Sequence, residues 1–299
     1  MKRSVKTGMI SLIILLLAVS HVCSQEPADT SVYRIETRDG NTYMGTIVHM
    51  DSVKVLFDSD KLGRIRILQV DIKRMYPVDQ KKIIDEVYWF ENPQATRYFY
   101  APNGKALKKG EGYYQNVWVL FNSFAVGVGN HFSLGGGMLP LFLFAGAATP
   151  VWITPKFSFP IQKDELDFGA GALAGTVLGE TNSGFGILYG ISTLGSKDRN
   201  LSLGLGYGYA GGDWTQSPIL NLSGMTRVGA NGYLLTENYF IKTPKSTTVL
   251  IWLGGRQIIR DWSLDYGLII PFNNEMDELI AIPWLGLIIP FGSIPQNTS

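Results

Sequence analysis

The sequence predicts an all-β protein in which a small β-domain of about five strands precedes an antiparallel transmembrane β-barrel of about twelve strands. Three observations carry this prediction. Charged residues make up only 17% of the chain, whereas 34 residues are glycine and 12% are aromatic. Soluble domains carry roughly 25% charged residues. In the C-terminal two-thirds, large apolar residues alternate with glycine and serine, and turn residues separate the alternating segments at short intervals.

Residues 1–24 predict a secretory signal peptide. Basic residues at the N-terminus precede an apolar run over residues 9–19. That run is shorter than the ~20 residues that a transmembrane helix needs. Small residues then fit cleavage before Gln25. The alternative is lipidation of Cys23.

The mature chain is expected to be nearly neutral, because removing Lys2, Arg3 and Lys6 changes the formal net charge from +1 to −2. This balance argues against nucleic-acid binding, which needs a basic face. Cys23 is the single cysteine and would leave with the signal peptide. The mature chain would then have no disulfide and no cysteine-based catalysis or metal site.

Residues 25–77 are expected to form a small periplasmic β-domain. Short alternating segments are separated by turn residues, and Asp39-Gly40 is a strong hairpin signal. The expected strands are residues 32–37, 42–50, 53–57, 64–68 and 72–76. Short strands with tight turns favour a small closed barrel of the SH3 or Sm kind.

The stretch YRIETRDGNTYMGTIVHMDSVKVLFDSDKLGRIRILQVDIKRMYPV resembles the Sm-like β-domains at the N-termini of exported Bacteroidota proteins. Cytoplasmic Sm proteins bind RNA, but the signal peptide places this domain where RNA is not expected. The resemblance implies a folded spacer or docking module, with an envelope protein as the partner of residues 25–95.

Residues 78–95 are expected to connect this domain to a barrel over residues 96–292, which residues 293–299 follow as a tail. Within the connector, residues 81–89 could form a short amphipathic helix that Asn92-Pro93 would end.

A charge-free stretch between Glu111 and Lys156 raises the alternative of transmembrane helices. Three consecutive glycines from Gly135 and three prolines oppose a helix there. Over residues 201–210, leucine and tyrosine instead alternate with serine and glycine. A soluble sandwich would carry charges on its second face, so glycine and serine there favour the inside of a narrow barrel.

Turn residues divide the barrel region into about twelve strands. They are expected at 96–102, 113–127, 131–138, 151–161, 167–179, 184–195, 200–210, 218–228, 233–241, 247–259, 262–271 and 280–291. About ten strands is the alternative, because the first segment is short. With the N-terminal domain in the periplasm, every second connection is periplasmic and short. The longer outer loops are then residues 103–112, 139–150 and 272–279.

The final expected strand ends on Phe291 after alternating apolar residues, which resembles the signal read by the outer-membrane assembly machinery. The stretch from ENPQATRYFYAPNGKALKKGEGYYQN to IPWLGLIIPFG also resembles barrel proteins of Bacteroidota with no established activity. This resemblance implies a bacterial outer-membrane location, in contact with membrane lipids and lipopolysaccharide, and no particular chemistry.

No catalytic, cofactor-binding or metal-binding residue is assigned. Barrel enzymes that depend on histidine place it on the outer side. His131 is instead expected beside a periplasmic turn, and no motif places a serine or aspartate near it. Asn273, Asn274, Glu275, Asp277 and Glu278 in an outer loop could hold calcium. The loop lacks EF-hand spacing, which favours a solvated loop.

Lysines in the expected first outer loop could meet lipopolysaccharide phosphates, although solvation is the simpler interpretation. They are Lys105, Lys108 and Lys109. Five charged residues are expected to line the lumen, namely Lys156, Arg227, Glu237, Arg256 and Asp265. Some should pair, because unpaired charge in a narrow interior is costly. These residues could line a pore or plug one.

Six tryptophans are expected mostly near strand ends or lipid-facing positions, as an interfacial belt. They are Trp118, Trp152, Trp214, Trp252, Trp262 and Trp284. The leading hypothesis is a non-enzymatic outer-membrane barrel that passively passes small solutes or hydrophobic molecules. The alternative is an anchor whose periplasmic domain binds envelope components. A lipid-modifying enzyme ranks last.

Overall fold

The computed structural model describes residues 31–78, 83–84, 87–244, 246–259, 261–273 and 278–292. The expected signal peptide, Cys23 and the C-terminal tail lie outside these residues. The chain divides into two compact units, Met1–Glu86 and Val87–Ser299, and each is described here by itself.

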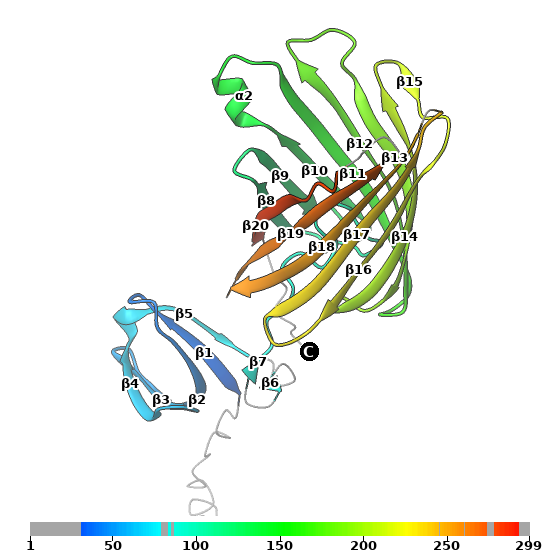
Figure 1. The fold of residues 1–299 in the computed structure, drawn as a ribbon. Helices are drawn as coiled ribbons and strands as arrows, with labels where there is room; N and C mark the ends of the chain where they lie inside the picture. The colour runs from blue at the N-terminus through cyan, green and yellow to red at the C-terminus, as the bar shows by residue number, and fades with distance from the viewer. Residues whose placement is uncertain are drawn as a thin grey trace, which may run out of the picture. The chain divides into compact units, whose positions relative to one another are not determined.

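The N-terminal unit contains one five-stranded antiparallel sheet, as expected (Figure 1). Its strands are β1 (Val32–Thr37), β2 (Thr42–Met50), β3 (Lys54–Ser59), β4 (Gly63–Leu68) and β5 (Ile72–Pro77), with a short 3-10 turn, η2 (Gln69–Asp71), before β5. The sheet order is β4-β3-β2-β1-β5. Ile35, Val55, Phe57 and Ile67 form its core, because alternate side chains of each strand point to the same face.

Two short strands follow, β6 (Ile83–Ile84) and β7 (Val87–Tyr88). The helix expected over residues 81–89 is therefore wrong at these positions. Isoleucine, valine and tyrosine favour extended backbone, and this preference outweighs the weak helical periodicity of so short a segment.

The second unit is a closed antiparallel barrel of twelve strands (Figure 1). They are β8 (Glu111–Val117), β9 (Phe121–Gly127), β10 (Phe132–Met138), β11 (Thr149–Gln162), β12 (Leu166–Leu178), β13 (Phe185–Gly195), β14 (Arg199–Ala210), β16 (Ile219–Arg227), β17 (Gly232–Lys242), β18 (Thr247–Ile259), β19 (Trp262–Asn273) and β20 (Ile282–Gly292). β8 pairs with β20, which closes the ring. A short helix, α2 (Pro140–Phe144), and a short strand, β15 (Asp213–Trp214), lie in connections. Within the described residues, no helix is long and apolar enough to cross a membrane.

The expected number of strands is confirmed, but two of the expected strands are wrong. Residues 96–102 form no strand, and the expected strand 113–127 is the hairpin β8–β9. Its turn contains Trp118 and Val119 at φ of 52° and 65°, a backbone region that bulky residues seldom adopt. The sequence carries no glycine, asparagine or proline at these two positions, and turn residues therefore could not mark the hairpin.

The connections differ in length at the two ends of the barrel. At one end, called the short-turn end, they are residues 128–131, 163–165, 196–198 and 228–231, together with the connection between β18 and β19. At the other, the long-loop end, they include residues 118–120, 139–148, 179–184 and 211–218. The β17–β18 and β19–β20 connections at this end contain residues outside the described part of the chain. The longest described connections lie at the long-loop end, as expected, although residues 118–120 at that end are as short as the turns opposite. The outer loop expected at 103–112 is not found there.

The alternation read from the sequence fixes which side chains face inward. On β14, Leu201, Leu203 and Leu205 are about half exposed on the outer face, whereas Ser202 and Gly204 are buried inside. Some inward glycines make room for large neighbours. A Cβ atom on Gly171 would lie 2.5 Å from the Tyr189 hydroxyl and 2.7 Å from the Pro155 carbonyl oxygen.

Candidate functional site: the barrel lumen

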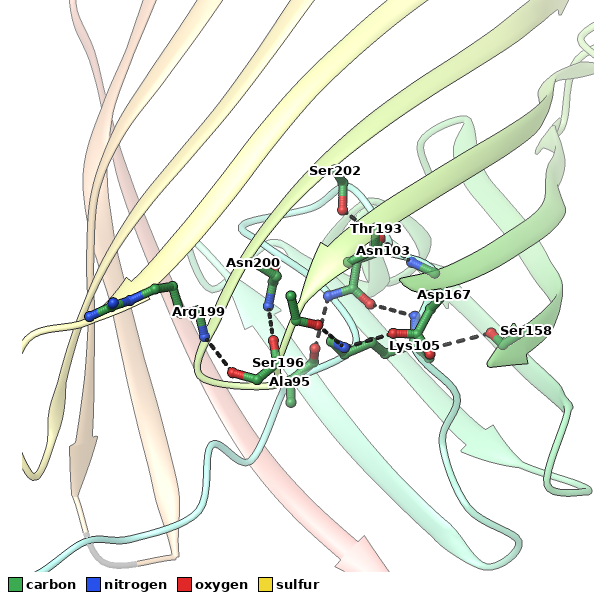
Figure 2. A network of polar contacts seen from close by, with 12 residues as sticks. Ala95, Asn103, Lys105, Ser158, Asp167, Thr193, Ser196, Arg199, Asn200 and Ser202 are labelled. Atoms are coloured by element: carbon green, nitrogen blue, oxygen red, sulfur yellow. Dashed lines mark hydrogen bonds and ion pairs between the residues drawn. The ribbon is translucent and has the colours of Figure 1, made fainter. Parts of the chain in front are cut away.

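Most of residues 91–110, called the inner segment, lies inside the barrel and fills the lumen towards the short-turn end. Gln94, Tyr98, Phe99 and Asn103 of this segment are at most 1% exposed. Their hydrogen bonds reach inward side chains on strands from several sides of the barrel, and Figure 2 shows part of this network. The expected strand 96–102 and the expected outer loop 103–112 are therefore both wrong. The tyrosine-rich run resembles a strand in composition, but its partners are wall side chains.

Arg256, on β18, joins the barrel wall to the inner segment through several hydrogen bonds. Its Nε and Nη2 atoms donate to the two carboxylate oxygens of Asp265 at 2.7 and 2.8 Å. The remaining donors reach the Gln94 carbonyl at 2.7 Å, the Tyr98 carbonyl at 2.8 Å and the Asn92 side-chain oxygen at 3.0 Å. Arg256 and Asp265 are both fully buried. The predicted pairing of lumen charges holds for these two residues.

Glu237 and Lys156 also face the lumen, where they bind the backbone of the inner segment. One Glu237 carboxylate oxygen accepts the N–H groups of Tyr100 and Ala101, each at 2.9 Å. The Lys156 ammonium donates to the carbonyls of Asn103 at 3.0 Å and Lys105 at 2.8 Å. These two wall charges therefore hold a plug in place.

Arg227 lies at the short-turn end of β16 and contacts the chain where it enters the barrel. Its guanidinium donates to the Phe90 carbonyl at 2.7 Å and to the Asp198 carboxylate at 3.3 Å. It also lies 4.7 Å from the centre of the Trp89 ring, a cation–π contact. The structure thus brings Lys156, Glu237 and Arg256 to the inner segment and pairs Asp265 with Arg256. Arg227 instead contacts Trp89 and Phe90, just before that segment.

Lys105 belongs to this site, although the sequence placed it in an outer loop. Its ammonium donates to Asp167 and to the Gly195 carbonyl, both at 2.7 Å (Figure 2). Sequence reasoning missed Asp167, because nothing in the sequence linked it to a lysine 62 residues earlier. The exposed residues Lys108 and Lys109 lie at the short-turn end, where the Lys109 N–H donates to the Asn130 side chain. The basic outer loop expected at these lysines is therefore wrong.

The other candidate sites stand as follows. His131 lies in the short connection between β9 and β10, as expected, with Nδ1 at 3.1 Å from the Ser158 carbonyl oxygen. Of the loop considered for calcium, residues 274–277 lie outside the described part of the chain. Among the residues that are described, no group of three histidine, cysteine or acidic side chains is placed to hold a metal ion.

The half of the lumen towards the long-loop end has a different chemistry. Among the described strand residues, none that faces inward there is charged, and Lys156 and Glu237 stand near the middle of their strands. The partly exposed Arg97 of the inner segment adds one further cation to the lumen, with its guanidinium 5.4 Å from the centre of the Tyr100 ring. The inward side chains in this half are mostly apolar or aromatic and partly exposed. They include Leu173, Ile187, Tyr189, Ile219, Tyr239, Ile241, Leu250 and Trp252.

An aromatic cluster, defined as Phe99, Tyr239, Trp252 and Trp284, lies between the two halves. The rings of Trp252 and Trp284 are 4.7 Å apart between centroids, and Phe99 lies 6.1 Å from Trp252. Tyr239 lies 6.2 Å from Trp252 on its other side. The cluster connects the buried inner segment with the partly exposed side chains of the long-loop half.

Three of the tryptophans therefore contradict the expected interfacial belt. Trp152 and Trp284 are 8% and 6% exposed and face inward, and so does Trp252. A signal was present in the sequence. Trp252 lies four residues before Arg256 in one strand, and even spacing puts both side chains on the same face.

Comparisons with known proteins do not place the chain in a family. No family model matches it, and no curated protein matches it. Among solved structures, it is similar to one described as "CymD monoaromatic hydrocarbon channel", with a TM-score of 0.36 and 9% sequence identity. The match covers 62% of this chain and 88% of that chain. Similarity at this level does not identify the protein.

Proposed function

We propose that the protein is a non-enzymatic outer-membrane barrel that admits uncharged apolar or aromatic molecules to its lumen from the long-loop end. One observation carries the proposal. The inward face of that half is uncharged, rich in aromatic side chains and partly exposed, whereas the charged half is filled by the inner segment.

The two halves favour different solutes. Burying an ion among apolar side chains without a partner is costly, so the long-loop half disfavours charged solutes. Aromatic rings offer large apolar faces to a planar guest. The lumen charges are already engaged by hydrogen bonds with the inner segment, with Phe90, with Gln115 or with one another. A continuous ion pathway is therefore not expected in this state.

Binding of 4-fluorotoluene to the purified protein in detergent tests the proposal, followed through the fluorine NMR signal of the ligand. We expect protein-dependent broadening that Trp252→Ala weakens by roughly fivefold or more, the equivalent of about 1 kcal/mol for a lost aromatic contact. Trp214→Ala is the matched control, because Trp214 is 52% exposed in β15. Absence of protein-dependent broadening in the unaltered protein would refute the proposal.

A second candidate function is an envelope anchor. The observation that favours it is the inner segment itself, since the chain that follows the N-terminal unit is fixed inside the barrel by buried charged side chains. A partner of the N-terminal unit would then be held at the membrane. Photo-crosslinking from Val70, which is 71% exposed, would capture an envelope protein if this is right. Crosslinks no more frequent than those from the exposed residue Asp60 would refute it.

A further inference from the structure

A groove with a volume of about 1000 Å³ lies on the outer face of the barrel. Its walls include Leu201, Leu234 and Leu253, which are 51%, 56% and 51% exposed and point away from the lumen. The outer surface of a barrel is convex, so a hollow of this size on it needs a local cause.

Short side chains on adjacent strands produce the hollow. Strand register places Leu201, Gly224, Thr236 and Leu253 side by side, on β14, β16, β17 and β18. Glycine and threonine thus lie between two leucines. In the adjacent row, Gly255 stands between Leu234 and Tyr266. The groove is deepest where the side chains are short, and the leucines and Tyr266 form its rim.

The groove begins at the short-turn end of the barrel and extends along the outer face towards the middle of the strands. Arg199 is the first residue of β14, and Thr226 is paired with it. Along the same row, Gly255 lies four residues before the end of β18 at Ile259. Strands of transmembrane barrels tilt by roughly 35–45°, so a line that crosses them also moves along the membrane normal.

The cation Arg199 lies at the short-turn end of the groove. Arg199 is exposed and lines the groove, and its guanidinium has no ion-pair or hydrogen-bond partner among the described residues. The neighbouring Asp198 carboxylate is already engaged by Arg227 and by the Tyr233 hydroxyl. Arg199 is therefore available to an anion from outside the protein.

We infer that this groove binds one anionic phospholipid, with its phosphate at Arg199 and an acyl chain over Gly224 and Gly255. A phospholipid has a charged headgroup followed by apolar chains, and the groove has the same order. Arg199 lies at its water-facing end, and apolar side chains follow along the outer face towards the middle of the membrane. Guanidinium groups bind phosphate through charge-assisted, often bidentate hydrogen bonds. The inference concerns the outer face and is independent of the lumen proposal.

Native mass spectrometry of the protein in detergent, titrated with phosphatidylglycerol, tests the site. We expect one lipid to bind more tightly than the rest. Arg199→Gln should weaken that binding by about fivefold, the effect of one cation near a lipid phosphate. Gly224→Leu should abolish it by filling the groove. A Cβ atom at Gly224 has no neighbour closer than 3.4 Å, so the substitution does not clash at its base.

Matched controls separate the groove from the rest of the lipid-facing surface. Lys163→Gln removes an exposed cation from another turn of the short-turn end. Gly190→Leu adds an outward leucine where nothing lies within 4 Å. Both should retain the tight lipid. Loss of binding in the controls as well, unchanged binding in Gly224→Leu, or equal affinity for phosphatidylcholine and phosphatidylglycerol would each overturn the inference. So would a dimer that Gly224→Leu breaks without altering the number of lipids bound.

Discussion

At the scale of single residues, buried charged side chains of the barrel wall bind the backbone of the inner segment. Arg256, Glu237 and Lys156 each contact main-chain atoms of the inner segment. Removing charged groups from water is costly, and only good geometry with full hydrogen bonding offsets the cost. In this barrel the wall side chains supply the partners that a segment without regular secondary structure cannot find within itself.

Arg256→Met tests this balance. The substitution leaves the Asp265 carboxylate buried without its partner, so we expect a loss of about 3–5 kcal/mol in unfolding free energy. Adding Asp265→Leu should restore part of the loss, because the uncompensated charge is then gone. The readout is the midpoint of the heat-dependent gel shift in detergent, with Lys163→Met as an exposed control. A single variant as stable as the unaltered protein would contradict the account.

At the scale of elements, strands with clear alternation could be predicted from the sequence, and elements that depend on distant partners could not. β14 shows its two faces directly in the alternation from Leu201 to Ala210. The inner segment does not, because Lys105 and Tyr98 are fixed by Asp167 and Asn200, far away in the chain. Lys156, Arg227, Glu237, Arg256 and Asp265 were proposed as lumen residues from the sequence, but the backbone groups that four of them bind were not.

Glycines within strands provide a second prediction. Gly171→Val would force a side chain against Tyr189 and the Pro155 carbonyl, so we expect a loss of roughly 1–3 kcal/mol from overpacking. Gly190→Val is the matched control, because a Cβ atom there has open space. Both variants are compared by heat-shift midpoint. Equal midpoints for the two variants would show that the inward face is not crowded.

The turn between β2 and β3 gives a prediction on pH. Backbone N–H groups of Val53 and Lys54 donate to Asp51 at 2.8 and 2.9 Å and lower the pKa of its carboxyl group. The lowered pKa means that this turn is stabilised above the ordinary value of about 3.9 and loses that support as pH falls through the folded value. The amide resonances of both residues should therefore titrate with a midpoint below the ordinary value. Asp51→Asn should remove this titration, and a midpoint at or above the ordinary value would contradict the assignment.

At the scale of the whole molecule, the barrel contains two environments in one lumen. Towards the short turns, inward side chains are polar, charged and buried against the inner segment. Towards the long loops, they are uncharged and partly exposed. The proposed function requires this division, because an apolar guest would enter at the long-loop end while the other end stays closed to ions.

Substituted-cysteine labelling tests that division most directly. In a Cys23→Ser background, which removes the single native cysteine, cysteines are placed at Ile187 and Leu250 in the long-loop half and at Ser202 and Ser263 in the other. We predict that a water-soluble maleimide labels the first pair quickly in the folded protein and the second pair only after unfolding. Equal labelling rates at all four positions would contradict a lumen that is closed at one end and open at the other.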